Sequence, residues 1–205
     1  MRFIRSGTVA AALISLAACS TGPEPELAPV AGTTGATGAQ AAAGTGASGV
    51  GTAPTSALTV ADQAFLTQAA YGGLAEVALG QLAMQRAASP DVRAFGQRMV
   101  EEHSRANAEL VVLAEAKGMT PPTAPDEGRQ AVVAALAALE GAEFDRQYLQ
   151  QQLAEHQLAV ALYDAEASGG TDPDVRTFAS RWTPALRDHA GHIVTLMAPA
   201  VGMVR

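Results

Sequence analysis

The helical architecture is clearest in residues 89–110, SPDVRAFGQRMVEEHSRANAEL. The stretch opens with Ser89, which can cap a helix, and Pro90, which suits the first helical position. Apolar and small residues then recur every three or four positions, which predicts one face of a helix. That face consists of Val92, Phe95, Met99, His103, Ala106, Leu110 and Leu113. Gly118 predicts the end of this helix, and the prolines after it predict a loop.

A second copy of this opening lies further along the chain. Pro90-Asp91-Val92-Arg93 is matched by Pro173-Asp174-Val175-Arg176, and a phenylalanine and an arginine follow at equal spacing in both copies. Each block follows one long helical pattern and begins another, which is what a duplicated helical hairpin leaves behind. The sequence therefore predicts an all-α fold over residues 58–200, an antiparallel four-helix bundle made of two hairpins.

The other three helices are predicted from their own apolar faces. A short additional helix is expected over residues 126–139, in the connection between the hairpins. The face of the first helix is Phe65, Ala69, Gly72, Glu76, Leu79 and Ala83; that of the third is Leu149, Leu153, His156, Val160, Tyr163 and Ala167; that of the fourth is Val175, Phe178, Trp182, Leu186, His189, Ile193 and Leu196.

The N-terminal residues predict export and lipid attachment. Residues 1–18 have a charged start and a short apolar core, as in a secretory signal peptide. The sequence Leu16-Ala17-Ala18-Cys19 resembles a bacterial lipobox, which implies cleavage before Cys19 and lipidation of that residue. Ser20 favours the outer membrane over the inner one, so we expect an anchor on the periplasmic face. Residues 19–57 are rich in Gly, Ala, Thr and Pro and are expected to form a disordered tether.

Composition excludes several classes of function. The chain has 205 residues and a net charge of −7, from 13 Lys and Arg against 20 Asp and Glu. A nucleic-acid-binding protein needs a basic face, and this sequence offers none. Its single cysteine excludes a disulfide framework and any Cys-rich metal site. Protein partners are not indicated by any motif.

Each of the four predicted apolar faces carries a polar residue where an apolar one is expected: Glu76, His103, His156 and His189. These residues lie roughly 19–28 Å from the turns of their hairpins, so they converge on one layer if both turns lie at the same end of the bundle. Buried polar groups must satisfy one another or a ligand. The set is therefore either a metal site, for which three imidazoles and a carboxylate suit zinc, copper or iron, or a structural polar network.

Neighbouring acidic residues receive a different interpretation. Glu101 and Glu102 adjoin His103 in sequence, and Asp188 adjoins His189. Adjacent residues on one helix point apart, so these carboxylates could orient an imidazole only on another helix, and we assign them to the solvated surface.

Several of these segments together resemble the bacterial domain-of-unknown-function family 4142, whose members are secreted or envelope proteins. The resemblance lies in Ala70-Tyr71-Gly72-Gly73 with Glu76-Val77-Ala78-Leu79-Gly80, in Met99-Val100-Glu101-Glu102-His103, in Phe144-Asp145 with Tyr148 and His156, and in Pro184-Ala185-Leu186 with His189. It spans residues 61–198 and implies a ferritin-like fold, with no established activity.

A ferritin-like fold raises the question of a di-iron centre, which needs Glu-x-x-His on two helices. The residues three positions before the histidines are Val100, Leu153 and Leu186, and none is acidic. This departure argues against ferroxidase, oxygenase or catalase chemistry. Two hypotheses remain: a non-enzymatic envelope module that binds a ligand, a metal or a partner, and a metal-dependent oxidoreductase or metal-handling protein of ferritin-like type.

Overall fold

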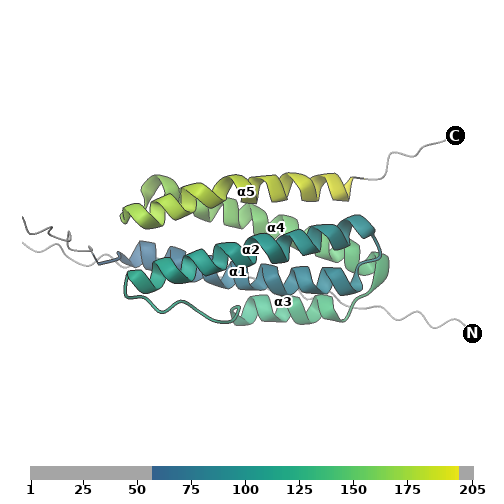
Figure 1. Ribbon diagram of the computed structural model, residues 1–205. Helices are drawn as coiled ribbons and strands as arrows, with labels where there is room; N and C mark the ends of the chain where they lie inside the picture. The colour runs from purple at the N-terminus through teal and green to yellow at the C-terminus, as the bar shows by residue number, and fades with distance from the viewer. Residues whose placement is uncertain (1–56, 199–205) are drawn as a thin grey trace, which may run out of the picture. The chain divides into compact units, whose positions relative to one another are not determined.

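The computed structural model describes residues 57–198, and these form five α-helices. They are α1 (Val60–Arg86), α2 (Pro90–Ala116), α3 (Glu127–Ala137), α4 (Gly141–Gly169) and α5 (Pro173–Met197). The four long helices form the bundle and α3 belongs to the connection, as the sequence predicted (Figure 1). The signal peptide predicted over 1–18, Cys19 and nearly all of the tether predicted over 19–57 lie outside the described residues.

The helix starts have the side-chain caps that the sequence predicts. Ser89 and Asp172 each accept hydrogen bonds from the backbone of the next turn, and a proline follows each of them at the first helical position. Thr59 and Asp62 form a reciprocal capping box at the start of α1. At the end of α2, Gly118 adopts a φ of 74°, a left-handed conformation that glycine accommodates without strain.

Matched hydrogen bonds confirm the internal repeat. The two hairpins correspond at an offset of 83 residues, the separation of Pro90 from Pro173. Asp145 of α4 accepts hydrogen bonds from the backbone of residues 88 and 89, in the turn of the first hairpin. At the same offset, Asp62 of α1 accepts from residues 171 and 172, in the turn of the second hairpin. Each hairpin thus clamps the turn of the other.

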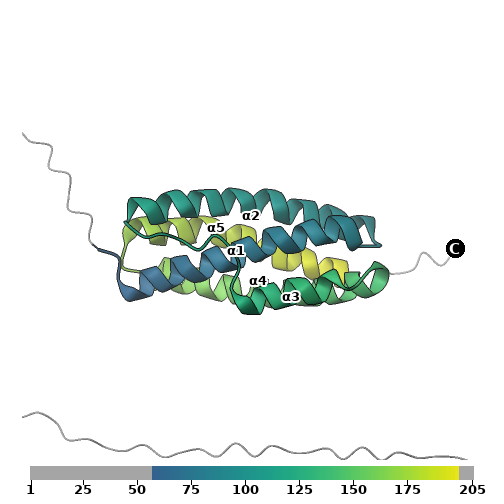
Figure 2. The same cartoon turned by 90° about the horizontal axis from the view of Figure 1, so that it is seen from below.

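These clamps place the two turns at opposite ends of the bundle, so the condition under which the polar residues were expected to converge, turns at one end, is not met (Figure 1). The reason is the crossover: the chain leaves α2 at one end, runs back along the bundle through α3, and starts α4 at the other end. Figure 2 shows α3 lying along α1 and α4. One long crossover between two hairpins is the connectivity of ferritin-like bundles.

The bundle core has two apolar clusters. One contains Phe65, Leu66, Leu110, Tyr163 and Phe178; the other contains Leu79, Phe95, Met99, Phe144 and Ile193. In every long helix, the polar positions singled out above fall between the residues of the two clusters. They are therefore in one layer near mid-bundle, which explains why they converge although the turns lie at opposite ends. None of the helices within 57–198 combines the length and apolar character needed to cross a bilayer.

Candidate metal centre

The layer between the two apolar clusters holds five buried polar side chains. All are less than a tenth exposed, with exposed fractions of 5% for Glu76, 8% for His103, 0% for Gln152 and 1% for both His156 and His189. The four residues predicted from the sequence are therefore all inside the bundle. Such burial is costly unless the polar atoms are paired or bind a ligand.

The three histidines of this layer form a compact cluster. They come from three helices: His103 from α2, His156 from α4 and His189 from α5. One ring nitrogen from each lies within 4.8 Å of the others. The ring centroids are 5.2–5.6 Å apart, so the imidazoles contact one another across the bundle axis. Among the residues described, this is the one group of three or more His, Cys, Asp or Glu side chains placed to hold a metal ion.

Outer hydrogen bonds fix the tautomers of two of these rings. Nδ1 of His156 lies 2.9 Å from the backbone oxygen of Gln152, and Nε2 of His189 lies 2.8 Å from a carboxylate oxygen of Glu102. Both partners can only accept a hydrogen bond: one is a backbone carbonyl, and the other is the carboxyl of Glu102, which is held in its charged form. Each of these ring nitrogens therefore carries the proton. In a neutral ring the other nitrogen then has a free lone pair.

The two free lone pairs face each other. Nε2 of His156 and Nδ1 of His189 are 3.2 Å apart, a distance suited to a hydrogen bond, yet neither neutral nitrogen has a proton to donate. Two nitrogens bound to one zinc ion at a tetrahedral angle lie about 3.3 Å apart, from Zn–N distances of about 2.0–2.1 Å. The third histidine adds to this, because its Nε2 is buried without a hydrogen-bond partner in the described structure. The donor set therefore fits a transition-metal ion.

Burial favours the neutral rings that a metal requires. Desolvation lowers the pKa of His156 to about 4 and that of His189 to about 4, and it lowers the pKa of His103 well below its ordinary value. Partial burial alone would raise the pKa of Glu102, but hydrogen bonds from Arg98 and His189 outweigh it and lower that pKa. Protonation of the histidines is thus disfavoured near neutral pH, while the carboxylate stays charged.

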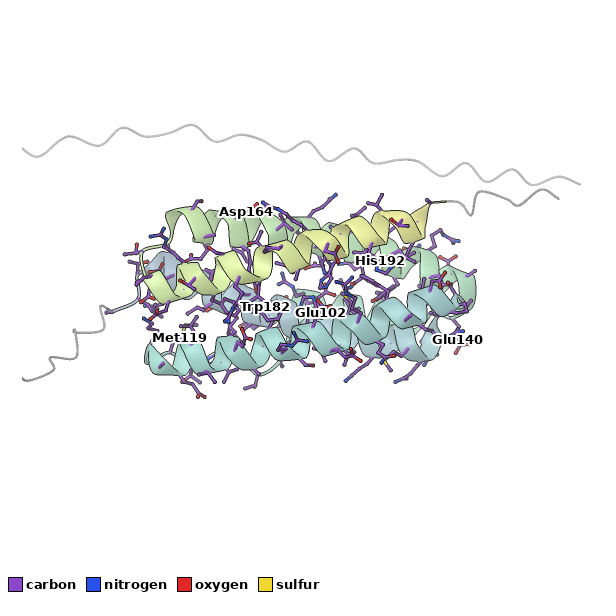
Figure 3. All side chains as sticks on the ribbon, turned by 45° about the horizontal axis from the view of Figure 1, so that its top comes forward. Glu102, Met119, Glu140, Asp164, Trp182 and His192 are labelled. Atoms are coloured by element: carbon purple, nitrogen blue, oxygen red, sulfur yellow. The ribbon has the colours of Figure 1, made fainter. Side chains whose placement is uncertain are left out.

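Glu102 was assigned to the solvated surface from the sequence, with an orienting contact to a histidine of another helix left as the alternative, and the structure shows that alternative. The carboxylate of Glu102 pairs with Nε2 of His189 on α5, and Arg98 also donates to it. Figure 3 shows Glu102 between α2 and α5 near the middle of the bundle. The sequence rule that adjacent residues point apart holds for Glu102 and His103. It says nothing about a histidine on another helix, and only the packing of α2 on α5 reveals that contact. A carboxylate behind a ligating histidine orients the ring and raises its basicity.

Glu76 lies beside the histidine cluster, on the far side of the His156 ring. Its carboxyl is 3.9 Å from Nδ1 of His156, the nitrogen that carries the proton. Gln152 donates a 2.6 Å hydrogen bond to it from the amide, and burial raises the pKa of Glu76 to about 8. The buried Tyr148 hydroxyl and the amide oxygen of Gln152 have no partner within the described structure. Gln152 was not singled out by sequence analysis, because an interior glutamine on a helix has no distinctive spacing.

Solved structures with a similar fold are helical bundles of low sequence identity. A DUF305 fragment from Deinococcus radiodurans has a TM-score of 0.60 and 19% identity, covering 68% of this chain and 96% of that one. CopM in its Cu(I)-bound form has a TM-score of 0.56 and 18% identity, with coverages of 65% and 93%. A conserved hypothetical protein from Mycobacterium tuberculosis has a TM-score of 0.53 and 17% identity, with coverages of 71% and 97%.

Sequence comparison gives one family. The family described as "Domain of unknown function (DUF4142)" matches residues 47–196, which include every residue of the polar layer. Among curated proteins, none matches the chain.

Proposed function

This chain belongs to the DUF4142 family, and from its histidine cluster we propose that it is a metal-handling protein of the bacterial cell envelope which binds copper. The ligands are His103, His156 and His189. The observation that carries the proposal is the pair of facing lone pairs on His156 and His189, 3.2 Å apart, whose tautomers are set by outer partners. A cation between the rings removes the repulsion and completes the layer.

Copper is the metal that we favour among zinc, copper and iron. Imidazole nitrogens suit all three, but the affinity of a given site for divalent ions peaks at Cu²⁺ in the Irving–Williams order. The similar structure of CopM is described in both Cu(I)-bound and Cu(II)-bound forms, which supports copper for this bundle as well. The protein is non-enzymatic in this proposal: it holds the metal and passes it on.

The place of action follows from the N-terminal residues. Cleavage before Cys19 and lipidation of that residue would anchor the chain, and the Gly- and Ala-rich residues up to 57 would tether the bundle to the membrane. The anchor is proposed to lie in the outer membrane, with the bundle on its periplasmic face. Copper reaching the envelope would meet this site before it enters the cell.

Metal titration of the purified full-length chain tests the copper site. We expect one copper ion per chain by elemental analysis. A strong chelator should remove this copper, and the copper-free protein should have a lower melting temperature. His103→Ala and His189→Ala should each lower the occupancy while the circular dichroism stays helical. The matched control is His192→Ala, one turn beyond His189, whose ring packs edge-on against Phe95 and is outside the cluster.

The same variants separate a metal site from a structural network. In a network without metal, His189→Ala removes the buried partner of Nε2 of His156, 3.2 Å away, and costs about 1–3 kcal/mol with or without chelator. No copper in the wild-type protein, together with equal melting in the presence and absence of chelator, would contradict the proposal. Parallel titrations with zinc and iron(II) decide which ion the site prefers.

A further inference from the structure

A cavity of about 260 Å³ adjoins the histidine cluster. It is bounded by residues of all four long helices and by Arg129 of α3. Glu76, His103 and His156 line it on the polar side, and the other walls are mostly small or apolar. We call it the Gly72 cavity, after the α1 residue in its wall. Nothing in the proposed copper site requires a space of this size.

The internal repeat explains where this space comes from. At the offset of 83 residues, the four polar residues Glu76, His103, His156 and His189 correspond to Ala159, Leu186, Gly73 and Ala106. All four of these counterparts line the Gly72 cavity. The mid-bundle layer therefore has two halves. The polar side chains fill one half, and their counterparts, which are mostly smaller, leave the Gly72 cavity in the other.

Gly72 leaves part of this space open. Glycine inside a helix destabilises it relative to alanine, so it is expected where close packing demands it. Close packing accounts for Gly73, whose added Cβ would lie 2.0 Å from a side-chain oxygen of Asn107. At Gly72 an added Cβ would meet nothing within 4 Å. This glycine has no packing role within the described structure, and any side chain there would enter the open space.

We propose that the Gly72 cavity binds a small, neutral, largely apolar organic molecule that carries one polar nitrogen or oxygen atom. This atom, which we call the donor end, is directed at the histidines. An apolar cavity of about 150 Å³ accepts benzene, so this volume suits about two fused rings. The only charged pair in its wall is Arg129 with Glu155, whose charges compensate each other at 3.3 Å, which favours a neutral ligand. The buried, unpartnered Nε2 of His103 offers the donor end a polar contact.

Binding of two matched probes to the metal-free, full-length chain tests the cavity. Benzimidazole has two fused rings with a donor nitrogen, and indene has the same shape without one. By calorimetry we expect saturable binding of benzimidazole with a dissociation constant at least tenfold lower than that of indene. Gly72→Leu should weaken benzimidazole binding at least tenfold, since the new side chain occupies the space.

Two further variants keep the test decisive. Ala159→Leu fills the cavity from the opposite wall, so it replaces the first variant if Gly72→Leu loses its helical circular dichroism. Gly191→Leu is the matched control, because Gly191 is an exposed helix glycine whose added Cβ also meets nothing within 4 Å. Unchanged binding in this control and loss in a folded cavity-filling variant supports the proposal. No saturable binding to the wild type, or equal binding to a folded cavity-filling variant, overturns it.

A copper-loaded sample tests where the donor points, and this arm alone rests on the proposed function. Benzimidazole should shift the Cu(II) visible spectrum of the wild type and of Gly191→Leu, but not that of Gly72→Leu. A wild-type spectrum unchanged at saturating benzimidazole shows that the donor does not reach the histidines. If the chain binds no copper, the proposed function fails while the calorimetry on metal-free protein still decides the cavity.

Discussion

At the scale of single residues, burial determines the chemistry of the polar layer. The same desolvation lowers the pKa of His156 to about 4 and raises that of Glu76 to about 8, because it opposes the charged form of both groups. Around neutral pH the layer thus holds neutral imidazoles and a protonated carboxyl. Its charged group is Glu102, which faces His189 from outside the ring cluster and is held ionised by Arg98.

Copper affinity should therefore survive mild acid. A histidine with the ordinary pKa of 6.5 is mostly protonated at pH 5 and would weaken binding about 30-fold, whereas a pKa of about 4 leaves it neutral. We expect the dissociation constant at pH 5 to lie within about threefold of its value at pH 7, and binding to weaken steeply only below pH 4. Competition titrations across this range, with folding monitored by circular dichroism, measure it. Weakening by 100-fold or more at pH 5 would show that the rings titrate like exposed histidines.

Glu76→Gln should stabilise the protein in a pH-dependent manner. The folded carboxyl keeps its proton up to about pH 8, while the unfolded one loses it near 4.5. Folding therefore takes up a proton in this window, and the contribution of Glu76 to stability is lost as the pH rises from 4.5 to 8. Glutamine mimics the protonated acid, so its advantage in free energy of unfolding should grow from pH 5 to pH 8. Urea unfolding at pH 5 and at pH 8 measures this difference, with the exposed Glu115→Gln as control. An equal gain in free energy of unfolding at the two pH values would contradict the prediction.

At the scale of helices and turns, the two hairpins depend on each other. Asp62 and Asp145 occupy equivalent positions of the repeat and hold equivalent turns, but their surroundings differ. Asp62 is fully buried and also accepts hydrogen bonds from the backbone and side chain of Thr59, whereas Asp145 is half-buried. In both clamps the first of the two turn donors belongs to an exposed residue.

Replacing each aspartate by alanine should expose this difference. Asp62→Ala removes the acceptor of the backbone N–H groups of residues 59, 171 and 172. Of these residues only 172 is buried, and its unpaired donor costs about 1–3 kcal/mol, whereas water can replace part of what Asp145→Ala removes, for a loss of about 1 kcal/mol. Urea unfolding of both variants gives the two free energies. Equal losses would mean that burial does not determine the strength of these clamps.

Glycine substitutions in α1 and α2 should have opposite effects. An added Cβ at Gly96 would lie 2.8 Å from the backbone oxygen of Gly80 and 2.6 Å from the Cβ of Ala83, where the two helices pack closely. We expect Gly96→Ala to cost about 1–3 kcal/mol through overpacking. Gly72→Ala enters open space and should stabilise the protein by about 0.5–1 kcal/mol, the usual helical gain over glycine. Thermal unfolding of both variants shows the sign directly, and a stabilising Gly96→Ala would refute the close packing.

The sequence predicted the helices better than their arrangement. Caps such as Ser89 and the apolar faces are local signals, so the helix starts and the polar position on each face could be predicted. The end at which each turn lies depends on the crossover, which no local signal encodes. The contact of Glu102 with His189 and the cavity beside Gly72 arise only when helices distant in sequence pack together. The prediction that the four polar residues share one layer is nevertheless correct, because all four lie near the middle of long helices.

At the scale of the whole molecule, the described bundle accounts for a binding site, and the N-terminal residues supply the prediction about location. We expect Cys19→Ala to abolish labelling by radioactive palmitate and to move the protein from the membrane fraction to the soluble fraction. The reason for this expectation is that the proposed acyl chains on Cys19 would provide the anchor, and no helix within 57–198 is long and apolar enough to cross a membrane. Fractionation and labelling of wild type and variant measure this. An unlabelled, soluble wild-type protein would contradict the anchor, and it would leave the copper site untouched.

The distribution of the ligands over the two hairpins has a kinetic consequence. His103 belongs to the first hairpin, and His156 and His189 belong to the second. Opening of the bundle between its halves would therefore separate a bound ion from at least one of its ligands. At an ion concentration 100 times the dissociation constant, such an opening becomes at most about 2.7 kcal/mol less favourable, since His156 and His189 stay together on one hairpin and can keep part of the affinity. The lifetime of the bound ion is then coupled to the separation of the two hairpins. A partner that separated the hairpins would speed the release of the ion.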